Sequence, residues 1–288
     1  MKISLFVAAG LLLLHATFVA FGPKPREPRF QNQEQQNRYI IERYLADSAS
    51  AKILYVGSSM TARIPPTGRP SCAYNLALHG ESSLTGLSVA ALAGSRPKLA
   101  FVEINVPERK PNAKLIAKGD SALARSLGVL AVQNMPVNLL FSYLFQFKGG
   151  GAPAFDARML ANGLPIEQDT YAHEIAPELL AENMQILRGQ VDALEASGTQ
   201  VIFFELPIHP VLEETPRARQ IRAAFAATFP KERLIRSTEL ARGIAIRTID
   251  GVHLSTEEAD AVARALQSYH ADACSRASPL ATGSALHA

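Results

Sequence analysis

The stretch "KILYVGSSMTARI", residues 52–64, decides the fold, because a short apolar run ends abruptly in a small, polar turn. Ile53–Val56 has the composition of a buried strand, and Gly57, Ser58 and Ser59 follow it directly. Such a turn can be no more than a tight connection between a strand and a helix. It can also expose a serine beside backbone N–H groups, ready for nucleophilic attack. The stretch therefore predicts a buried strand and offers a candidate nucleophile.

Apolar runs alternate with helical patterns along the rest of the chain, which predicts an α/β protein with a parallel sheet flanked by helices. Gly198 suits the C-terminal end of a helix, and Ser255 suits an N-cap. We expect strands at 53–56, 73–76, 99–105, 200–206 and, more weakly, 234–236. We expect helices at 38–48, 83–93, 176–197, 217–228 and 256–270.

Residues 3–22 carry no charge and are about long enough to cross a bilayer as a helix. The small residues expected at a signal-peptide cleavage site are poorly placed, which favours an uncleaved single-pass anchor over a cleaved signal. Lys24, Arg26 and Arg29 come after the apolar run, and positive-inside counting therefore argues mildly against export of the C-terminal domain. Residues 23–48 are expected to form a linker and a short helix. Residues 49–274 are expected to form the main domain, with an insertion at about 106–177, and residues 275–288 are expected to form a flexible tail.

Composition excludes several classes of function. The 288 residues have a net charge of only +3 and no basic stripe, so nucleic-acid binding has little support. The sequence contains neither a metal-ligand spacing nor a glycine-rich phosphate loop, and we expect no metal and no cofactor.

Polar residues follow several of the predicted strands. Gly80 ends the second strand and Asn105 ends the third, and each can donate a hydrogen bond to a developing oxyanion. Asp250 and His253 lie in "IDGVHLSTEEADAVA", residues 249–263, just before a helix. A carboxylate at that spacing can hold one imidazole nitrogen and leave the other as a base for Ser59. A turn aspartate and a partly exposed histidine are an equally good interpretation of this segment alone.

The order Ser59, Gly80, Asn105 and His253, with Asp250 ahead of the histidine, resembles the SGNH (GDSL-type) hydrolase superfamily over about residues 51–270. The resemblance implies a three-layer, flavodoxin-like fold and a Ser59–His253–Asp250 triad. It also implies that the N–H groups of Ser59 and Gly80 and the amide of Asn105 hold the oxyanion. The segment "DGVHLS" is the most specific match.

The first block departs from the family pattern. It commonly reads Gly-Asp-Ser, whereas this chain reads Gly57-Ser58-Ser59. The missing aspartate is not the acid of the triad, so the catalytic set is retained. Ser59 aligns with the family serine, while Ser58 stays open as an alternative nucleophile.

The resemblance implies an esterase or O-acetyltransferase, and membrane-tethered relatives often act on acetyl groups of cell-envelope or exported polysaccharides. The expected location is the inner membrane with the catalytic domain in the periplasm, or secretion if the N-terminus is cleaved. The expected partners are an acylated polysaccharide or other ester, the membrane and an acetylation complex. Two alternatives stay open: a lipid-ester hydrolase with residues 137–147 as a lid, and a catalytically silent scaffold of an acetylation complex.

In a fold of this kind, Cys72 and Cys274 reach the same edge of the sheet, and the resemblance therefore allows a disulfide in an exported domain. Three further residues are candidates for substrate contacts. Glu205 and His209 follow the fourth strand, and His79 precedes Gly80, although structural roles are at least as good an interpretation for all three.

Overall fold

The centre of the protein is a five-stranded sheet in which every strand pairs in parallel with its neighbours. The computed structural model describes residues 2–65, 72–94, 96–120, 128–145, 154–229 and 234–269. The strand order is β2-β1-β3-β4-β5, the doubly wound order of flavodoxin-like proteins. The predicted α/β class and parallel sheet are confirmed. The strands are β1 (Ile53–Val56), β2 (Ala73–Asn75), β3 (Leu99–Glu103), β4 (Gln200–Phe204) and β5 (Leu234–Ile235).

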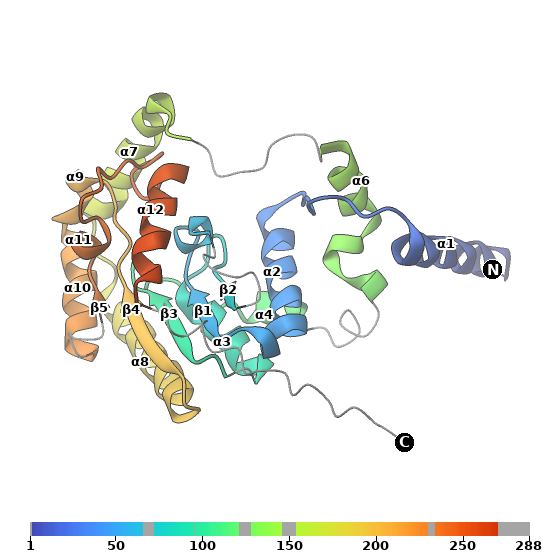
Figure 1. Ribbon diagram of the computed structural model, residues 1–288, viewed down its shortest axis with the longest axis horizontal. Coiled ribbons are helices and arrows are strands. Elements are labelled where there is room, and N and C mark those ends of the chain that lie inside the picture. Colours follow the sequence, from blue (N-terminus) through green and yellow to red (C-terminus); the bar gives the residue numbers. More distant parts are fainter. Residues whose placement is uncertain are drawn as a thin grey trace, which may run out of the picture.

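Both faces of the sheet are buried, and for this reason β1 and β3 are apolar almost throughout. Leu54 and Val56 point into one core, whereas Ile53 and Tyr55 point into the other. Helices cover the two faces as separate layers (Figure 1). The first face is covered by α2 (Gln33–Asp47), α3 (Ser83–Ala93), α8 (Pro177–Ala196) and α10 (Pro216–Thr228), and the second by α11 (Ser237–Leu240) and α12 (Thr256–Gln267).

Helix α1 (Lys2–Phe21) projects away from the sheet and its helices (Figure 1). No helix among the described residues combines the length and apolarity that a bilayer crossing requires. The next helix starts earlier than expected, inside the segment interpreted as a linker. Asn32 caps it by accepting a hydrogen bond from the backbone N–H of Gln35 at 3.0 Å, and α2 therefore starts at Gln33.

The expected insertion at 106–177 contains several separate elements. The first part holds α4 (Ala113–Gly119), which lies against α2, and two short 3₁₀ turns, Gly128–Leu130 and Val132–Asn134. The aromatic run at 137–147 contributes most of α6 (Pro136–Phe145), beside α1. The last part is α7 (Ala157–Ala172), on the opposite side of the molecule from α6 (Figure 1). A four-residue helix, α9 (Pro210–Glu213), follows β4.

Candidate active site

The three predicted triad residues lie in contact. The Oγ of Ser59 lies 2.8 Å from Nε2 of His253, and Nδ1 of His253 lies 2.6 Å from Oδ2 of Asp250. Ser59 follows β1, while Asp250 and His253 come from the turn that precedes α12. Parallel strands bring their carboxyl ends to one edge of the sheet, which places the Ser59 turn at the edge where sites form in such folds.

The turn before α12 fixes both the acid and the base. Oδ1 of Asp250 accepts hydrogen bonds from the backbone N–H groups of Val252 at 3.1 Å and His253 at 2.8 Å. Gly251 has a φ of +112°, a backbone conformation that favours glycine. Its carbonyl accepts a hydrogen bond from the N–H of His209 at 2.7 Å, which ties the turn to the loop after β4.

The hydrogen bonds of Asp250 also set the protonation pattern of the triad. Burial alone would raise the pKa of this carboxyl, but the hydrogen bonds from the His253 imidazole and from two backbone N–H groups outweigh burial and lower the pKa from its ordinary value. Asp250 is therefore ionised at neutral pH and accepts a hydrogen bond from the Nδ1–H group of His253. That tautomer leaves Nε2 free to accept the hydroxyl proton of Ser59, as a general base must.

The second serine of the turn is turned away from this arrangement. Ser58 is buried, with 2% exposure, and its hydroxyl donates to Oε1 of Glu103 at 2.8 Å. Ser59, by contrast, is partly exposed and is the serine that contacts His253. Between the two serines left open by the sequence, the geometry favours Ser59. Glu103, at the end of β3, is a residue that the sequence interpretation missed.

The two further oxyanion candidates occupy neighbouring loops. Gly80 has a φ of +71°, and an added Cβ would overlap the side chain of Gln33 on α2. Asn105 exchanges two hydrogen bonds with the backbone of Leu206, through Nδ2 to the carbonyl at 2.9 Å and from the N–H to Oδ1 at 2.8 Å. An amide nitrogen carries two hydrogens, so this clamp leaves one of them for an oxyanion.

The three candidates for substrate contacts have different surroundings. Glu205 is buried and forms an ion pair with Arg222 at 2.6 Å, which joins β4 to α10. His209 caps α9, with Nδ1 accepting from the N–H of Val211 at 3.4 Å. Both arrangements favour the structural interpretation of these residues.

His79, unlike Glu205 and His209, interacts electrostatically with a triad residue. Burial lowers the pKa of its imidazole, and the charges of Arg63 and His253 lower it further. The ring nitrogen Nε2 lies 3.0 Å from the amide of Gln36. Its backbone exchanges two hydrogen bonds with the side chain of Asn37, at 2.7 and 2.8 Å. Helix α2 therefore holds the loop that carries Gly80.

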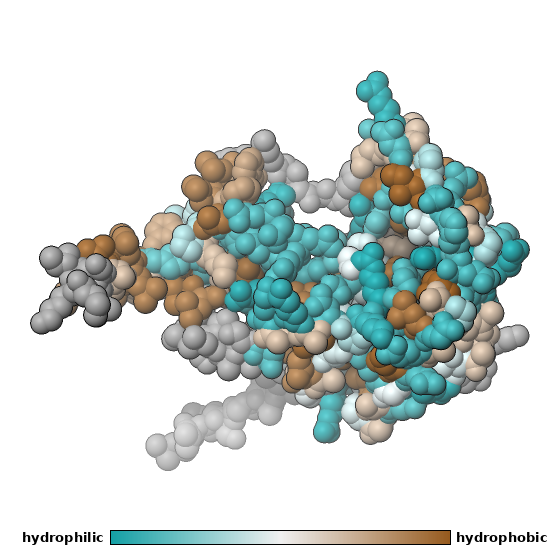
Figure 2. Space-filling view, turned by 180° about the vertical axis from the view of Figure 1, so that it is seen from behind, coloured by the Kyte–Doolittle hydropathy of each residue, from teal (hydrophilic) through white to brown (hydrophobic). Residues whose placement is uncertain are grey.

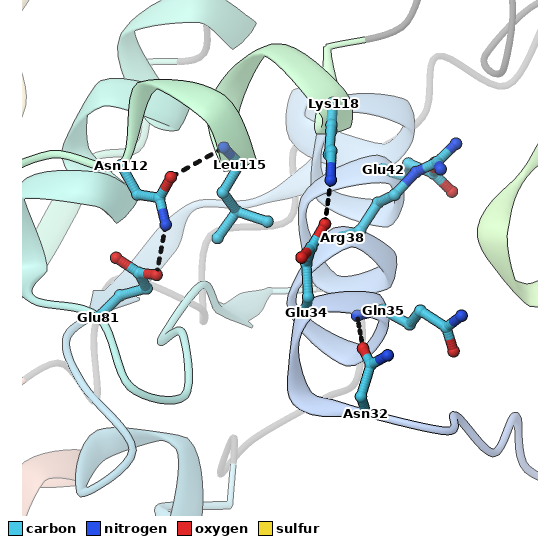
Figure 3. A network of polar contacts seen from close by, with 9 residues as sticks. All are labelled: Asn32, Glu34, Gln35, Arg38, Glu42, Glu81, Asn112, Leu115 and Lys118. Carbon is cyan, nitrogen blue, oxygen red and sulfur yellow. Dashed lines mark hydrogen bonds and ion pairs between the residues drawn. The ribbon is translucent and has the colours of Figure 1, made fainter.

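A polar pocket lies beside this loop, and the sequence did not predict it because residues 33–37, the first part of α2, were expected to belong to a linker. Figure 3 shows part of its wall: Asn112 donates to Glu81 at 2.8 Å and caps α4, while Lys118 pairs with Glu34 across α4 and α2. The pocket is lined by Gln33, Glu34, Asn37, His79, Gly80, Glu81, Asn112, Lys114 and Leu115.

Helix α7 lies against the turn that carries Asp250, and the sequence did not predict this contact. At Gly163 an added Cβ would lie 2.6 Å from Cβ of Asp250 and 2.8 Å from its Cα. The side chains of Leu164 and Glu167 approach Gly251. Burial raises the pKa of Glu167, and the nearby charge of Asp250 raises it further.

Arg63 adds a positive charge near the triad. It ends a 3₁₀ turn, Thr61–Arg63, shortly after Ser59, and burial lowers the pKa of its guanidinium while the charge of Asp250 opposes that shift. Its Nη1 is buried and makes no hydrogen bond within the part of the chain that the structure describes. This nitrogen is therefore a buried donor without a hydrogen-bond partner among the described residues.

The two cysteines differ in what the structure says of them. Cys72 is buried immediately before β2 and is not a free thiol. Cys274 lies outside the described residues, as do residue 270 and the tail at 275–288. The helix expected at 256–270 ends earlier, at Gln267. The pairing of Cys72 with Cys274 stays a prediction.

Comparison with known proteins adds no assignment, since no family model matches the chain and no curated protein is significantly similar to it.

Proposed function

We propose that this protein is a serine-dependent ester hydrolase or O-acyltransferase of the SGNH type. The observation that carries the proposal is the contact of Ser59 Oγ with His253 Nε2 at 2.8 Å, together with that of His253 Nδ1 with Asp250 at 2.6 Å. Nucleophile, base and orienting acid in this order are the arrangement required for acyl transfer through a covalent intermediate.

The reaction takes place in two steps. Ser59 Oγ attacks the ester carbonyl while His253 Nε2 takes its proton and then returns it to the departing alcohol. Hydrogen bonds from the backbone N–H of Ser59 and Gly80 and from the remaining amide hydrogen of Asn105 stabilise the oxyanion. In the second step, His253 removes a proton from water or from a sugar hydroxyl, and that oxygen attacks the acyl carbonyl. The bond to Ser59 Oγ then breaks, and His253 returns the proton to Ser59 Oγ.

The substrate class follows from the resemblance to the membrane-tethered members of the superfamily. We propose an O-acetylated polysaccharide of the cell envelope or exported to the exterior, with the catalytic domain in the periplasm. The polar pocket beside Gly80 supports this choice, because its carboxylate, amide and ammonium groups are suited to bind sugar hydroxyls. A lipid-ester hydrolase with α6 as a lid has less support. Helix α2 lies between α6 and α12, the helix that follows the His253 turn (Figure 1).

Contact with a membrane through the N-terminal helix is part of the proposal. Brown, hydrophobic residues gather on the projecting end of the molecule in Figure 2. They include exposed residues of α1, among them Phe6, Leu13 and Phe21, and Val137, Leu140 and Leu144 of α6. Phe18 of α1 packs edge-on against Tyr143 of α6, with 6.1 Å between the ring centroids, so the two apolar surfaces are neighbours.

The test of the enzymatic proposal uses the full chain with p-nitrophenyl acetate and with a fluorophosphonate probe that modifies activated serines. We expect Ser59→Ala to abolish both turnover and labelling, and the control Ser268→Ala, at an exposed serine after α12, to retain both. The probe needs no acyl acceptor, so it also reports a strict transferase. A wild type that neither hydrolyses the ester nor reacts with the probe would reject the proposal in favour of a silent scaffold.

A further inference from the structure

We infer that Glu103 is the positioning residue of the nucleophile turn, and that its carboxylate, supplied from β3, acts in place of the aspartate missing at Ser58. This inference deepens the proposed function and rests on it. It assigns a role to a buried carboxylate beside the nucleophile turn that the triad does not use.

The contacts of Glu103 converge on the turn that carries Ser59. Its Oε2 accepts hydrogen bonds from the backbone N–H of Ser58 at 2.8 Å and of Thr61 at 3.3 Å, and from the hydroxyl of Thr61. Its Oε1 accepts from the hydroxyl of Ser58 at 2.8 Å. One carboxylate therefore holds the residues on either side of the nucleophile, and a carboxylate is suited to this because both of its oxygens accept hydrogen bonds.

The turn is built to admit this carboxylate. A Cβ at Gly57 would lie 2.4 Å from Oε2 of Glu103 and 2.4 Å from Oγ1 of Thr61, so only glycine fits. Ser58 fills the remaining space and adds a bond of its own, because its Oγ accepts from the N–H of Met60 at 3.1 Å. The turn thus depends on Gly57, Ser58 and Glu103 as a unit.

Burial makes the arrangement costly and therefore informative. Glu103 is 2% exposed, and desolvation raises the pKa of its carboxyl, although the hydrogen bonds from Thr61 and Ser58 oppose that shift. No cation is paired with it in the part of the chain described here, where its partners are the N–H and O–H groups of the turn. A buried carboxylate held only by neutral donors costs folding free energy, and its presence here therefore points to a role in the turn.

Exchange of the carboxylate between the two positions tests the inference. Glu103→Gln keeps the shape but replaces one accepting oxygen with an NH₂ group that cannot accept, and we expect kcat to fall about 10- to 100-fold with KM changed less than about twofold. Ser58→Asp places a second carboxylate against Glu103, and we expect a larger loss. In the double variant Ser58→Asp/Glu103→Gln one carboxylate faces one amide, and we expect at least about a tenfold recovery of kcat over Ser58→Asp.

The matched control is Glu42→Gln. Glu42 is also a buried carboxylate, held by Arg38 at 2.6 Å and by the N–H of Val132 at 2.8 Å, but it lies on α2. We expect this variant to lose stability and retain kcat. Equal effects of Glu42→Gln and Glu103→Gln on kcat, or no recovery in the double variant, would overturn the inference.

Crystal structures separate this inference from the enzymatic proposal. We expect the 2.8 Å contact between Ser59 Oγ and His253 Nε2 to be lost in Ser58→Asp and restored in the double variant. The wild type could lack esterase activity and probe reactivity while the contact is still lost in Ser58→Asp and restored in the double variant. In that case the proposed function fails and the positioning role stands. An unchanged contact in all variants would reject the positioning role, whatever the activity.

Discussion

His253 Nε2 lies 2.8 Å from Ser59 Oγ, although 194 positions separate the two residues in the chain. The contact joins the turn after a central strand to the turn before the last described helix. Most of the sheet must therefore be assembled before the two atoms can meet. The proposed activity would thus depend on nearly the whole α/β domain, and the kinetics of each variant need a measurement of folding beside them.

Replacement of Asp250 by asparagine should reduce kcat about 10⁴-fold, because an amide no longer stabilises the imidazolium or the required tautomer of His253. The measurement is the steady-state turnover of p-nitrophenyl acetate with circular dichroism on the same samples. Asp192→Asn, at an exposed aspartate of α8, should leave kcat within about twofold of the wild type. A loss of less than about tenfold in Asp250→Asn would show that the carboxylate is not the acid of the triad.

The lowered pKa of Asp250 also predicts how stability depends on pH. Its pKa in the folded protein lies below the ordinary value of an aspartate side chain, so ionised Asp250 stabilises the fold above that ordinary value. This contribution is lost as the pH falls below about 4 through the folded-state pKa. Urea denaturation of the wild type and Asp250→Asn at several pH values measures it. The difference in unfolding free energy should shrink toward pH 2, and a difference that grows would contradict the assignment.

Gly163→Ala should impair both folding and catalysis. The added methyl would lie 2.6 Å from Cβ of Asp250, so α7 or the triad turn must shift. We expect a loss of stability and a fall in kcat of about 10- to 100-fold. Gly189→Ala on α8 is the matched control, since nothing lies within 4 Å of its added Cβ. That variant should gain about 0.5–1 kcal/mol from helix propensity alone, with no change in kcat.

Cys72 and Cys274 should be linked in protein that has been exported and isolated without reductant. A bridge across so long a stretch of chain can stabilise the fold by about 4–5 kcal/mol. Mass analysis of a non-reduced digest should yield one joined peptide, and alkylation should modify neither thiol until a reductant is added. Two thiols that react at once would remove the bridge and weaken the argument for export.

Much of the central sheet could be predicted from the sequence, because its strands are buried on both faces. A continuous apolar run such as Ile53–Val56 predicts such a strand, and no choice has to be made about which side chains face the core. The predicted bounds of this strand are confirmed. The third and fourth strands end at Glu103 and Phe204, two residues earlier than expected. The residues Asn105 and Leu206 that follow them exchange hydrogen bonds through a side chain instead of extending the ladder.

The contacts that support the triad could not be predicted in the same way. Asp250 and His253 are close in sequence, so their spacing already indicated a joint role. Glu103 meets Ser58 only because β3 pairs with β1, and an acidic residue at the end of a strand resembles many others. The approach of Gly163 to Asp250 depends on the path of the chain before α7, for which the sequence has no local signal.

The early start of α2 limits how far Ser59, His253 and Asp250 can lie from α1. Only residues 22–32 separate α1 from α2, and a chain of that length spans about 40 Å at most when fully extended. Since α2 also holds the loop of Gly80, the site cannot move away from α2. If α1 rests on a lipid surface, only acyl groups in a thin layer above that surface come within reach, and polymers farther out must be brought to the enzyme.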